Sequence, residues 1–301
     1  MALYLCRMKK YFELIRIKSW VKNGFLLLPL IFSLKLNETN TILYALHGVL
    51  VFCLASSFIY IINDVLDANV DALHPRKKSR PIASGAITKS KALILSLGCL
   101  CGAVALHFAS QMPYWFGTTV LTYLALNLAY SLYLKTVVLV ELLVVSTNFV
   151  LRVLAGCFAI SVAPSNWILV VTFFLSLLLV VVKRKSEMHL LQAEASNHRV
   201  VLKQYTLGFL NGLVYLAATV TITAYLLYSM DPQVTSALNT QRLIYSTFFV
   251  VIGILRLILI SETAGHGGEG DPTVLLFKDR FIQITIICWI IYLYLILYGL
   301  K

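Results

Sequence analysis

The sequence predicts an all-helical, polytopic integral membrane protein, and its composition, its apolar segments and the placement of its charges each indicate this class. Of the 301 residues, 59% are hydrophobic and 13% are charged, and the mean hydropathy is +0.85. Soluble domains are about half apolar and about a quarter charged. A soluble protein of this length has too little interior to bury so much apolar surface, so that surface must face lipid. The net charge of +12 then indicates membrane orientation and anionic ligands, and not nucleic acid.

Nine segments are long and apolar enough to cross a bilayer, since a spanning helix needs about 20 apolar residues. They are 20–36, 41–62, 91–110, 114–134, 137–160, 166–182, 206–230, 243–261 and 281–300. The first is the weakest, because Lys22 and Asn23 interrupt it. Before it, residues 1–19 interleave basic and apolar side chains, which predicts an amphipathic helix in the membrane interface. We expect residues 1–301 to form a single membrane-embedded domain.

Positive charges orient the predicted helices, because Lys and Arg accumulate on the cytoplasmic side of a membrane. With the N-terminus in the cytoplasm, cytoplasmic segments hold 20 of the 25 Lys and Arg residues and outer segments hold 3. The three longest polar loops, 63–90, 183–205 and 262–280, then share the cytoplasmic side. The polar residues that could carry chemistry are therefore expected to face the cytoplasm.

An acidic strip follows the second predicted span. Asp64, Asp67 and Asp71 are spaced i, i+3, i+7, which places their carboxylates on one face of a helix, and Asn63 lies just off that face. Carboxylates at a membrane surface are costly unless they are compensated. Magnesium held by one or two carboxylates and by substrate phosphates would compensate them. The alternative is salt bridging to the basic residues that follow, which are Arg76, Lys77, Lys78 and Arg80.

A basic cluster, Lys183 and Arg184 with Glu187, leads out of the sixth predicted span. The spacings of i, i+4 and i, i+3 allow ordinary helical ion pairs at a positively charged flank. The alternative is that these residues form a second anion-binding site.

Inside the fifth predicted span, Glu141, Asn148 and Arg152 share one helix face. Ionisable groups at membrane depth usually face an internal cavity, and the alternative is a structural pair between helices. Near the start of the chain, Lys18 and Lys22 flank Trp20 at the interface. These lysines could bind a lipid phosphate or anchor the helix in anionic lipid.

The segment Asn63-Asp64-Val65-Leu66-Asp67-Ala68-Asn69-Val70-Asp71, with Arg80-Pro81-Ile82-Ala83-Ser84-Gly85 after it, resembles the first aspartate-rich signature of the UbiA superfamily of intramembrane prenyltransferases. The resemblance covers most of the chain. It implies a UbiA-like fold of nine transmembrane helices around a central cavity open to the cytoplasm. It also implies a magnesium-dependent transferase.

A departure from the common pattern defines a branch of that family. Typical members carry a second aspartate-rich motif after the sixth span, whereas this chain has Lys183-Arg184-Lys185-Ser186-Glu187. That segment is similar to the Lys-Arg-x-x-Glu motif of the decaprenyl-phosphate phosphoribosyltransferase branch, although the branch leads us to expect an aromatic residue at Lys185. The segments 18–23 and 270–280 are similar to that branch as well.

The branch implies transfer of 5-phosphoribose from phosphoribosyl pyrophosphate to a polyprenyl phosphate, with release of pyrophosphate, for cell-envelope glycans. It places the enzyme in the bacterial plasma membrane, among membrane lipids, without a nucleic-acid partner and with the oligomeric state open. The resemblance implies that Asp64, Asp67 and Asp71 are catalytic and that Asn63, Asp64 and Asp67 bind magnesium. It implies that the lipid phosphate is bound by Lys18, Lys22 and Asn23. The residues expected to bind the donor and its phosphates are Lys77, Arg80, Lys183, Arg184, Glu187, Arg152 and Asn148.

Two other functions fit parts of the sequence. One is an ordinary prenyltransferase that moves a prenyl group from a prenyl diphosphate to an aromatic acceptor, and the missing second acidic motif argues against it. The other is a transporter for a phosphorylated solute. The single-sided polar loops and the lack of matched interrupted helices in two halves argue against that function.

Overall fold

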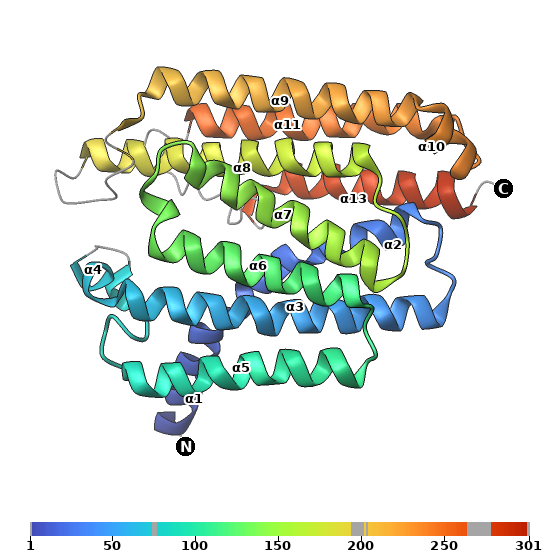
Figure 1. Cartoon of the computed structure of the whole chain (residues 1–301). Coiled ribbons are helices and arrows are strands. Elements are labelled where there is room, and N and C mark those ends of the chain that lie inside the picture. Colours follow the sequence, from blue (N-terminus) through green and yellow to red (C-terminus); the bar gives the residue numbers. More distant parts are fainter. Residues whose placement is uncertain (1, 74–76, 194–201, 203, 264–277, 300–301) are drawn as a thin grey trace. The chain divides into compact units, whose positions relative to one another are not determined.

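The computed structural model describes residues 2–73, 77–193, 202, 204–263 and 278–299. Every regular element in these ranges is helical, as Figure 1 shows, so the predicted all-helical class is confirmed. The longer helices are α1 (Ala2–Ile15), α3 (Thr39–Leu66), α5 (Lys89–Ala109), α6 (Tyr114–Leu132), α7 (Val140–Ala159), α8 (Asn166–Ala193), α9 (Leu207–Met230), α11 (Thr247–Thr263) and α13 (Arg280–Tyr294). The shorter elements are η1 (Ile17–Leu27), α2 (Leu28–Phe32), α4 (Ala68–Leu73), η2 (Lys77–Ser79), η3 (Leu134–Thr136), α10 (Pro232–Ala237), η5 (Arg242–Ser246) and the π-helical η7 (Leu295–Gly299).

Seven helices of the described ranges are long and apolar enough to cross a membrane, which makes the chain an integral membrane protein. They are Thr39–Leu66, Lys89–Ala109, Val140–Ala159, Asn166–Met188, Leu207–Met230, Arg242–Glu262 and Arg280–Gly299. Each coincides with a predicted span to within a few residues. The predicted count of nine is not confirmed, and the sidedness of the membrane stays a prediction.

Two predicted spans, 20–36 and 114–134, are not among these seven helices. The first is divided between the 3₁₀-helix η1 and the five-residue helix α2, which has Pro29 in its first turn, where proline is tolerated. The second forms α6, which is long enough but carries polar residues such as Thr119, Thr122 and Asn127. These polar residues lower the apolarity of α6.

Helices continue past the apolar segments into the predicted polar loops. Helix α8 runs to Ala193, so the segment 183–187 is helical, as its i, i+3 and i, i+4 spacings assume. Helix α3 extends to Leu66 before α4 begins. The predicted interfacial helix 1–19 ends earlier, at Ile15. The remaining parts of the three predicted loops, 74–76, 194–201 with 203, and 264–277, lie outside the described residues.

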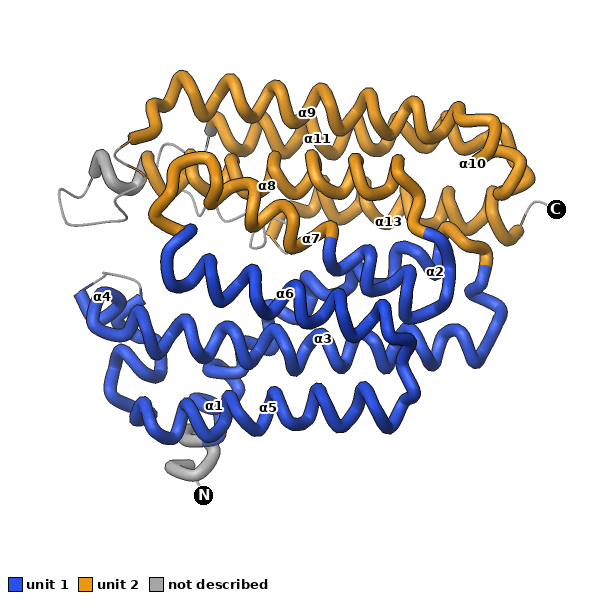
Figure 2. The backbone as a smooth tube through the Cα atoms, in the orientation of Figure 1, with its two compact units in different colours: residues 1–31, 35–134, 151–163 blue, residues 32–34, 135–150, 164–301 orange. Residues whose placement is uncertain are grey.

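The chain divides into two compact units, coloured separately in Figure 2. Unit 1 comprises residues 1–31, 35–134 and 151–163, and unit 2 comprises residues 32–34, 135–150 and 164–301. The division falls within α7, whose first part belongs to unit 2. The single-domain expectation is not tested by this division and stays a prediction.

In unit 1, α3 packs against α5, α6 and η1. The core between them includes Leu26, Phe52, Phe116 and Tyr123, all 1% exposed or less. Close packing of η1 on α7 depends on Gly156, because a Cβ atom at that position would lie 2.1 Å from the backbone oxygen of Leu26. Small residues commonly allow such close approach between helices in membranes.

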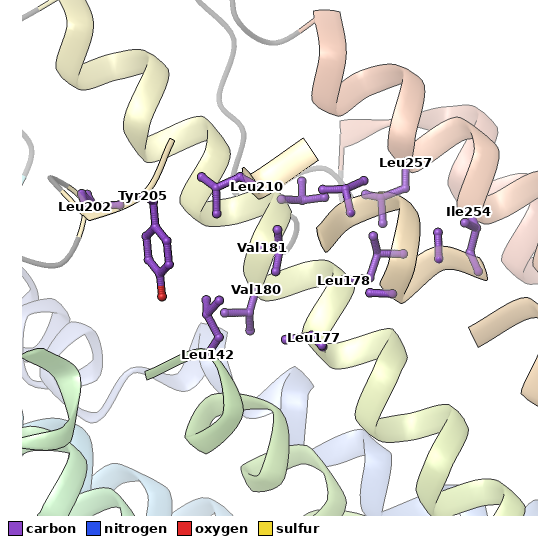
Figure 3. Packing of buried hydrophobic residues seen from close by; sticks show 14 residues of the cluster. Leu142, Leu177, Leu178, Val180, Val181, Leu202, Tyr205, Leu210, Ile254 and Leu257 are labelled. Carbon is purple, nitrogen blue, oxygen red and sulfur yellow. The ribbon is translucent and has the colours of Figure 1, made fainter. Parts of the chain in front are cut away.

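In unit 2, α8 packs against α9, and α11 packs against α9 and α13. Figure 3 shows the buried leucine and valine side chains of α8 packing among residues of α9 and α11. Leu178 and Leu210 lie at the centre of this core and are fully buried. Tyr205 fixes the start of α7 to this core, because its hydroxyl accepts a hydrogen bond from the backbone N–H of Leu139 at 2.9 Å.

Candidate functional site

The acidic strip lies in unit 1, where α3 ends and α4 begins. Although α3 ends at Leu66, the backbone keeps a near-helical path, since the N–H of Asp67 donates to the Asn63 carbonyl and the N–H of Asp71 donates to the Asp67 carbonyl. The predicted i, i+3, i+7 arrangement is therefore preserved. Asp64 and Asp71 are each 3% exposed, whereas Asn63 and Asp67 are half-buried.

Basic side chains neutralise the buried members of the strip. Arg80 Nη1 donates to Asp64 Oδ1 at 3.0 Å and to Asp71 Oδ2 at 2.5 Å, so one guanidinium bridges both carboxylates. Lys77 Nζ lies 3.8 Å from Asp71 Oδ1, and Arg16 donates to Asp64. The structure thus contains the salt bridges that the sequence left open as an alternative.

Arg16 was missed by the sequence reasoning. It connects α1 to η1 in the left-handed backbone region, with φ 58°, and its guanidinium lies over the Tyr60 ring at 5.2 Å. A non-glycine residue rarely adopts this conformation unless other contacts hold it. The ion pair with Asp64, 48 positions along the chain, supplies such a contact. No local sequence pattern predicts the ion pair of Arg16 with Asp64. The basic residues interleaved through 1–19 were the only feature of the sequence that could have pointed to Arg16.

The residues of the strip fit magnesium only in part before a substrate binds. Among the described residues, no three His, Cys, Asp or Glu side chains are placed to hold a metal ion together. Asn63 Nδ2 donates to Asp67 Oδ2 at 3.0 Å, which keeps these two predicted ligands side by side. Magnesium usually takes one or two carboxylates and completes its shell with phosphate oxygens and water. The donor set therefore fits an ion that arrives with its phosphates.

The basic cluster of unit 2 is built around Arg184, which is 4% exposed. Its Nε donates to both carboxylate oxygens of Glu141, at 2.9 and 3.0 Å, and its Nη2 donates to Glu141 Oε2 at 2.6 Å. Its Nη1 donates to Glu187 Oε2 at 2.6 Å. Glu141 is buried, whereas Glu187 is half-buried. A guanidinium held this firmly presents a fixed positive charge.

Lys185, the departure from the branch motif, is 2% exposed and donates from Nζ to Glu262 Oε1 at 2.6 Å. The pair links α8 to the end of α11. Lys183, the third cation of the segment, is half-buried. Sequence reasoning did not find Glu262, although a lysine inside a helical apolar flank signals a need for a carboxylate partner.

The polar face of α7 is buried as predicted, with Glu141, Asn148 and Arg152 at most 5% exposed. The alternative of structural pairs between elements describes its contacts. Glu141 pairs with Arg184 of α8, and Arg152 Nε donates to Asn23 Oδ1 at 2.9 Å. Arg152 Nη2 also donates to the Tyr123 hydroxyl at 3.2 Å.

Asn23, whose predicted contact with the lipid phosphate stays a prediction, is fully buried and contacts other protein groups. Its Nδ2 lies 3.2 Å from both Ser56 Oγ and Cys53 Sγ, and its Oδ1 accepts from Arg152. Lys18 is exposed and Lys22 is half-buried. Because η1 is a 3₁₀-helix with three residues per turn, these lysines do not stack as an i, i+4 pair of an α-helix would.

Eight of the predicted site residues therefore fall into a metal-compatible group in unit 1 and a fixed-cation group in unit 2, and Lys18, Lys22, Asn23, Asn148, Arg152 and Lys183 lie outside both. The unit 1 group is Asn63, Asp64, Asp67, Asp71, Lys77 and Arg80, with Arg16 added by the structure. The unit 2 group contains Arg184 and Glu187, with Glu141 added as the anchor of the arginine. Acidic oxygens beside exchangeable cations suit a metal-bound diphosphate, and a fixed arginine suits a phosphate.

The fold and these charged helix ends define an integral membrane protein suited to phosphate-bearing substrates. The chain belongs to the UbiA prenyltransferase family, whose model matches residues 26–265. The decaprenyl-phosphate phosphoribosyltransferase of Mycobacterium tuberculosis is 30% identical over 280 residues, covering 92% of this chain and 90% of the relative. The Corynebacterium glutamicum protein of the same name is 30% identical over 278 residues, covering 92% and 83%. The chain is therefore a transferase enzyme.

A solved structure supports the fold independently. A UbiA homolog from Archaeoglobus fulgidus bound to GPP and Mg²⁺ superposes with a TM-score of 0.69 and covers 96% of this chain and 99% of that chain. At 18% sequence identity, this likeness establishes the UbiA-like fold alone.

Proposed function

We propose that the enzyme transfers 5-phosphoribose from phosphoribosyl pyrophosphate to a polyprenyl phosphate and releases pyrophosphate. The observation that carries this proposal is the fixed arginine near the end of α8. Arg184 is buried and anchored by Glu141 at the position where a second acidic motif would serve a prenyl diphosphate. Phosphoribosyl pyrophosphate carries a C5 phosphate in addition to its diphosphate, and a fixed guanidinium suits that extra anion. The names of the relatives at about 30% identity agree with this substrate class.

The reaction forms a bond between a phosphate oxygen of the lipid and C1 of the ribose. The bond between C1 and the pyrophosphate oxygen breaks, and its electron pair leaves with pyrophosphate. The transition state resembles an oxocarbenium ion, so positioning and charge stabilisation supply most of the rate enhancement. The lipid phosphate is already anionic, and the mechanism therefore needs no general base.

In unit 1, the strip receives the diphosphate. Asn63, Asp64 and Asp67 would hold magnesium, and the ion would supply positive charge to neutralise the departing pyrophosphate. Asp71 supports this group from the next helical turn. Arg80 and Lys77, which pair with the carboxylates in the structure, exchange them for phosphate oxygens when the substrate binds.

In unit 2, Arg184 and Lys183 hold the phosphate on C5. Glu187 orients Arg184 or accepts a hydrogen bond from a ribose hydroxyl, since it is the more exposed of the two carboxylates on that arginine. For Asn148 and Arg152, which are buried on α7, the predicted contact with donor phosphates stays a prediction. On η1, the exposed Lys18 and the half-buried Lys22 contact the lipid phosphate. We place the active site on the cytoplasmic side of the bacterial plasma membrane.

The donor assay tests the reaction directly. Membranes containing the enzyme receive either labelled phosphoribosyl pyrophosphate with polyprenyl phosphate or labelled prenyl diphosphate with an aromatic acceptor. We expect a labelled lipid and free pyrophosphate only from the first pair. A prenylated aromatic product from the second pair would contradict the proposal, and uptake of donor without release of pyrophosphate would indicate a transporter.

Asp67→Asn tests the metal role, because Asp67 is half-buried and its replacement leaves the buried carboxylates in place. We expect a loss of turnover on the order of 10²-fold and a raised magnesium requirement. The matched control is Asp231→Asn, since Asp231 caps the N-terminus of α10. Full activity of the Asp67 variant in the absence of magnesium would refute the assigned metal site.

A further inference from the structure

A hollow of about 900 Å³ lies in unit 2, where α9 is followed by α10 and η5. Figure 1 shows that α9 runs antiparallel to α8. The hollow at the C-terminal end of α9 therefore lies at the end of this helix pair away from Arg184. Its wall is mostly polar and includes Thr235, Asn239, Thr240 and Gln241. This hollow belongs to no part of the site described above.

Arg242 is the charged residue in the described lining of this hollow. It is exposed, and its guanidinium forms no hydrogen bond or ion pair with another described residue. Its backbone is fixed, because its N–H donates to Thr240 Oγ1 at 3.2 Å and its carbonyl accepts from the Tyr292 hydroxyl at 2.9 Å. The carboxylate of Asp231, which precedes the lining residue Pro232, is engaged with the Trp167 indole and with the backbone of α10. The hollow thus presents a positive charge that pairs with no described carboxylate.

An apolar groove of about 500 Å³ continues from the polar hollow, and Ile244 and Tyr245 line both. The rest of the groove is formed by Phe248, Phe249 and Tyr292. Tyr245 and Phe248 are 68% and 65% exposed, and they lie on a helix that can span the membrane. Exposed aromatic residues at the end of such a helix are typical of the membrane interface.

We propose that this hollow and groove bind one anionic glycerophospholipid of the phosphatidylglycerol type. Arg242 contacts its phosphate, the polar wall contacts the hydroxyl groups of the headgroup, and one acyl chain follows the aromatic groove. Charge complementarity favours an anionic lipid over a zwitterionic one. A bare phosphate, as on a polyprenyl phosphate, would leave most of the polar wall without partners. A headgroup with its own hydroxyls satisfies that wall.

The test measures lipid binding to the purified full-length protein in detergent by native mass spectrometry. Phosphatidylglycerol is titrated into the wild type, into Arg242→Gln and into Tyr245→Ala. We expect one tightly retained lipid on the wild type and binding about tenfold weaker after loss of the charged contact of Arg242. Tyr245→Ala should weaken binding less, and because the Tyr245 side chain is exposed, its removal leaves the packed core of unit 2 in place.

Lys35→Gln is the matched control, because it removes a positive charge that the predicted topology also places on the outer side and that is not among the residues lining this hollow. It should bind phosphatidylglycerol as the wild type does. Equal retention by wild type and Arg242→Gln would overturn the proposal. Equal retention of phosphatidylcholine, or displacement of phosphatidylglycerol by polyprenyl phosphate at lower concentration, would overturn the assigned occupant.

Discussion

The charged groups of the two units are built in opposite senses. In unit 1 the carboxylates of Asp64 and Asp71 are buried, with side chains 4% exposed, and the cations around them are 25 to 31% exposed. In unit 2 the cation is buried, since the Arg184 side chain is 5% exposed, and Glu187 is its more exposed partner at 31%. The two groups thus differ in which charge lies beneath the more exposed partners.

Under the proposed function, this difference determines which contacts each group would exchange when a ligand binds. Unit 1 keeps its carboxylates and can release Arg80 or Lys77 toward an incoming anion, which leaves carboxylate oxygens for a metal. Unit 2 keeps Arg184 on Glu141 and can release Glu187, which leaves guanidinium N–H groups for a phosphate. One group is thus suited to a metal-bound diphosphate and the other to a phosphate.

The largest expected effect contrasts the two partners of Arg184. Glu141→Gln removes the buried bidentate partner and leaves a buried charge poorly compensated, so we expect the free energy of unfolding to fall by about 3–5 kcal/mol. Glu187→Gln removes the exposed partner and should cost about 0–1 kcal/mol while weakening donor binding. Thermal unfolding in detergent measures both. Equal losses for the two variants would break the distinction between fixed and exchangeable partners.

The second effect concerns Arg80, the bridge between Asp64 and Asp71. Arg80→Gln leaves buried carboxylates short of positive charge, so we expect a loss of about 1–3 kcal/mol. Magnesium should restore more stability to this variant than to the wild type, because it can replace the missing cation. The control is Lys78→Gln, since Lys78 is exposed and has no ion pair among the described contacts. Equal stabilisation of Arg80→Gln and Lys78→Gln by magnesium would contradict the idea that a metal ion can replace the Arg80 side chain.

The third effect tests how far the unit 1 group depends on the seating of η1, which begins next to Arg16. Gly156→Ala places a methyl group against the Leu26 carbonyl and should cost about 1–3 kcal/mol through displacement of η1. Gly98→Ala is the matched control, because no atom lies within 4 Å of its added Cβ, and it should stabilise α5 by about 0.5–1 kcal/mol. Unfolding temperatures of the two variants should therefore move in opposite directions.

The smallest effect belongs to a half-buried pair outside both groups, Arg256 and Asp279. Asp279 accepts from Arg256 and caps α13, and the hydrogen bond from Arg256 is the main cause that lowers the pKa of the Asp279 carboxyl below its ordinary value. Because the folded-state pKa is lowered, the pair stabilises the protein fully above the ordinary pKa of about 3.9 and loses this contribution as the pH falls through the folded value.

Asp279→Asn isolates that pH-dependent contribution, since asparagine caps a helix about as well as aspartate. The unfolding temperature of the variant should lie below that of the wild type at pH 7. The difference should shrink under strongly acidic conditions. A difference that is unchanged between neutral and acidic pH would show that the cap, and not the ion pair, stabilises this helix end.

Much of the fold was predictable because the signals are local. The length of the apolar segments places seven of the nine predicted spans. Helical spacing correctly grouped Asp64 with Asp71 and identified the face of α7 that is buried. The features that were not predicted depend on contacts between segments distant in the sequence. The 3₁₀-helix η1 packs on α3 and passes close to Gly156, and no periodicity of the sequence reveals this arrangement.

The pairings within the candidate site were less predictable. Helical spacing says which residues share a face, but it does not say which distant residue faces them. Glu141 pairs with Arg184, 43 positions along the chain, and Lys185 pairs with Glu262, 77 positions along. Arg16 was missed for the same reason. The sequence therefore indicated the chemistry of the site, and the structure supplied the partners.

The adjacent ion pairs of α8 have a mechanical consequence. Successive residues of an α-helix point about 100° apart, and here Arg184 is bound to α7 while Lys185 is bound to Glu262 at the end of α11. A rotation of α8 about its axis, or a slide of one residue, would break both contacts together. Within unit 2, the two ion pairs together fix the rotation of α8 about its axis and so the direction of the Arg184 guanidinium. Movements that accompany turnover should therefore preserve this rotation of α8.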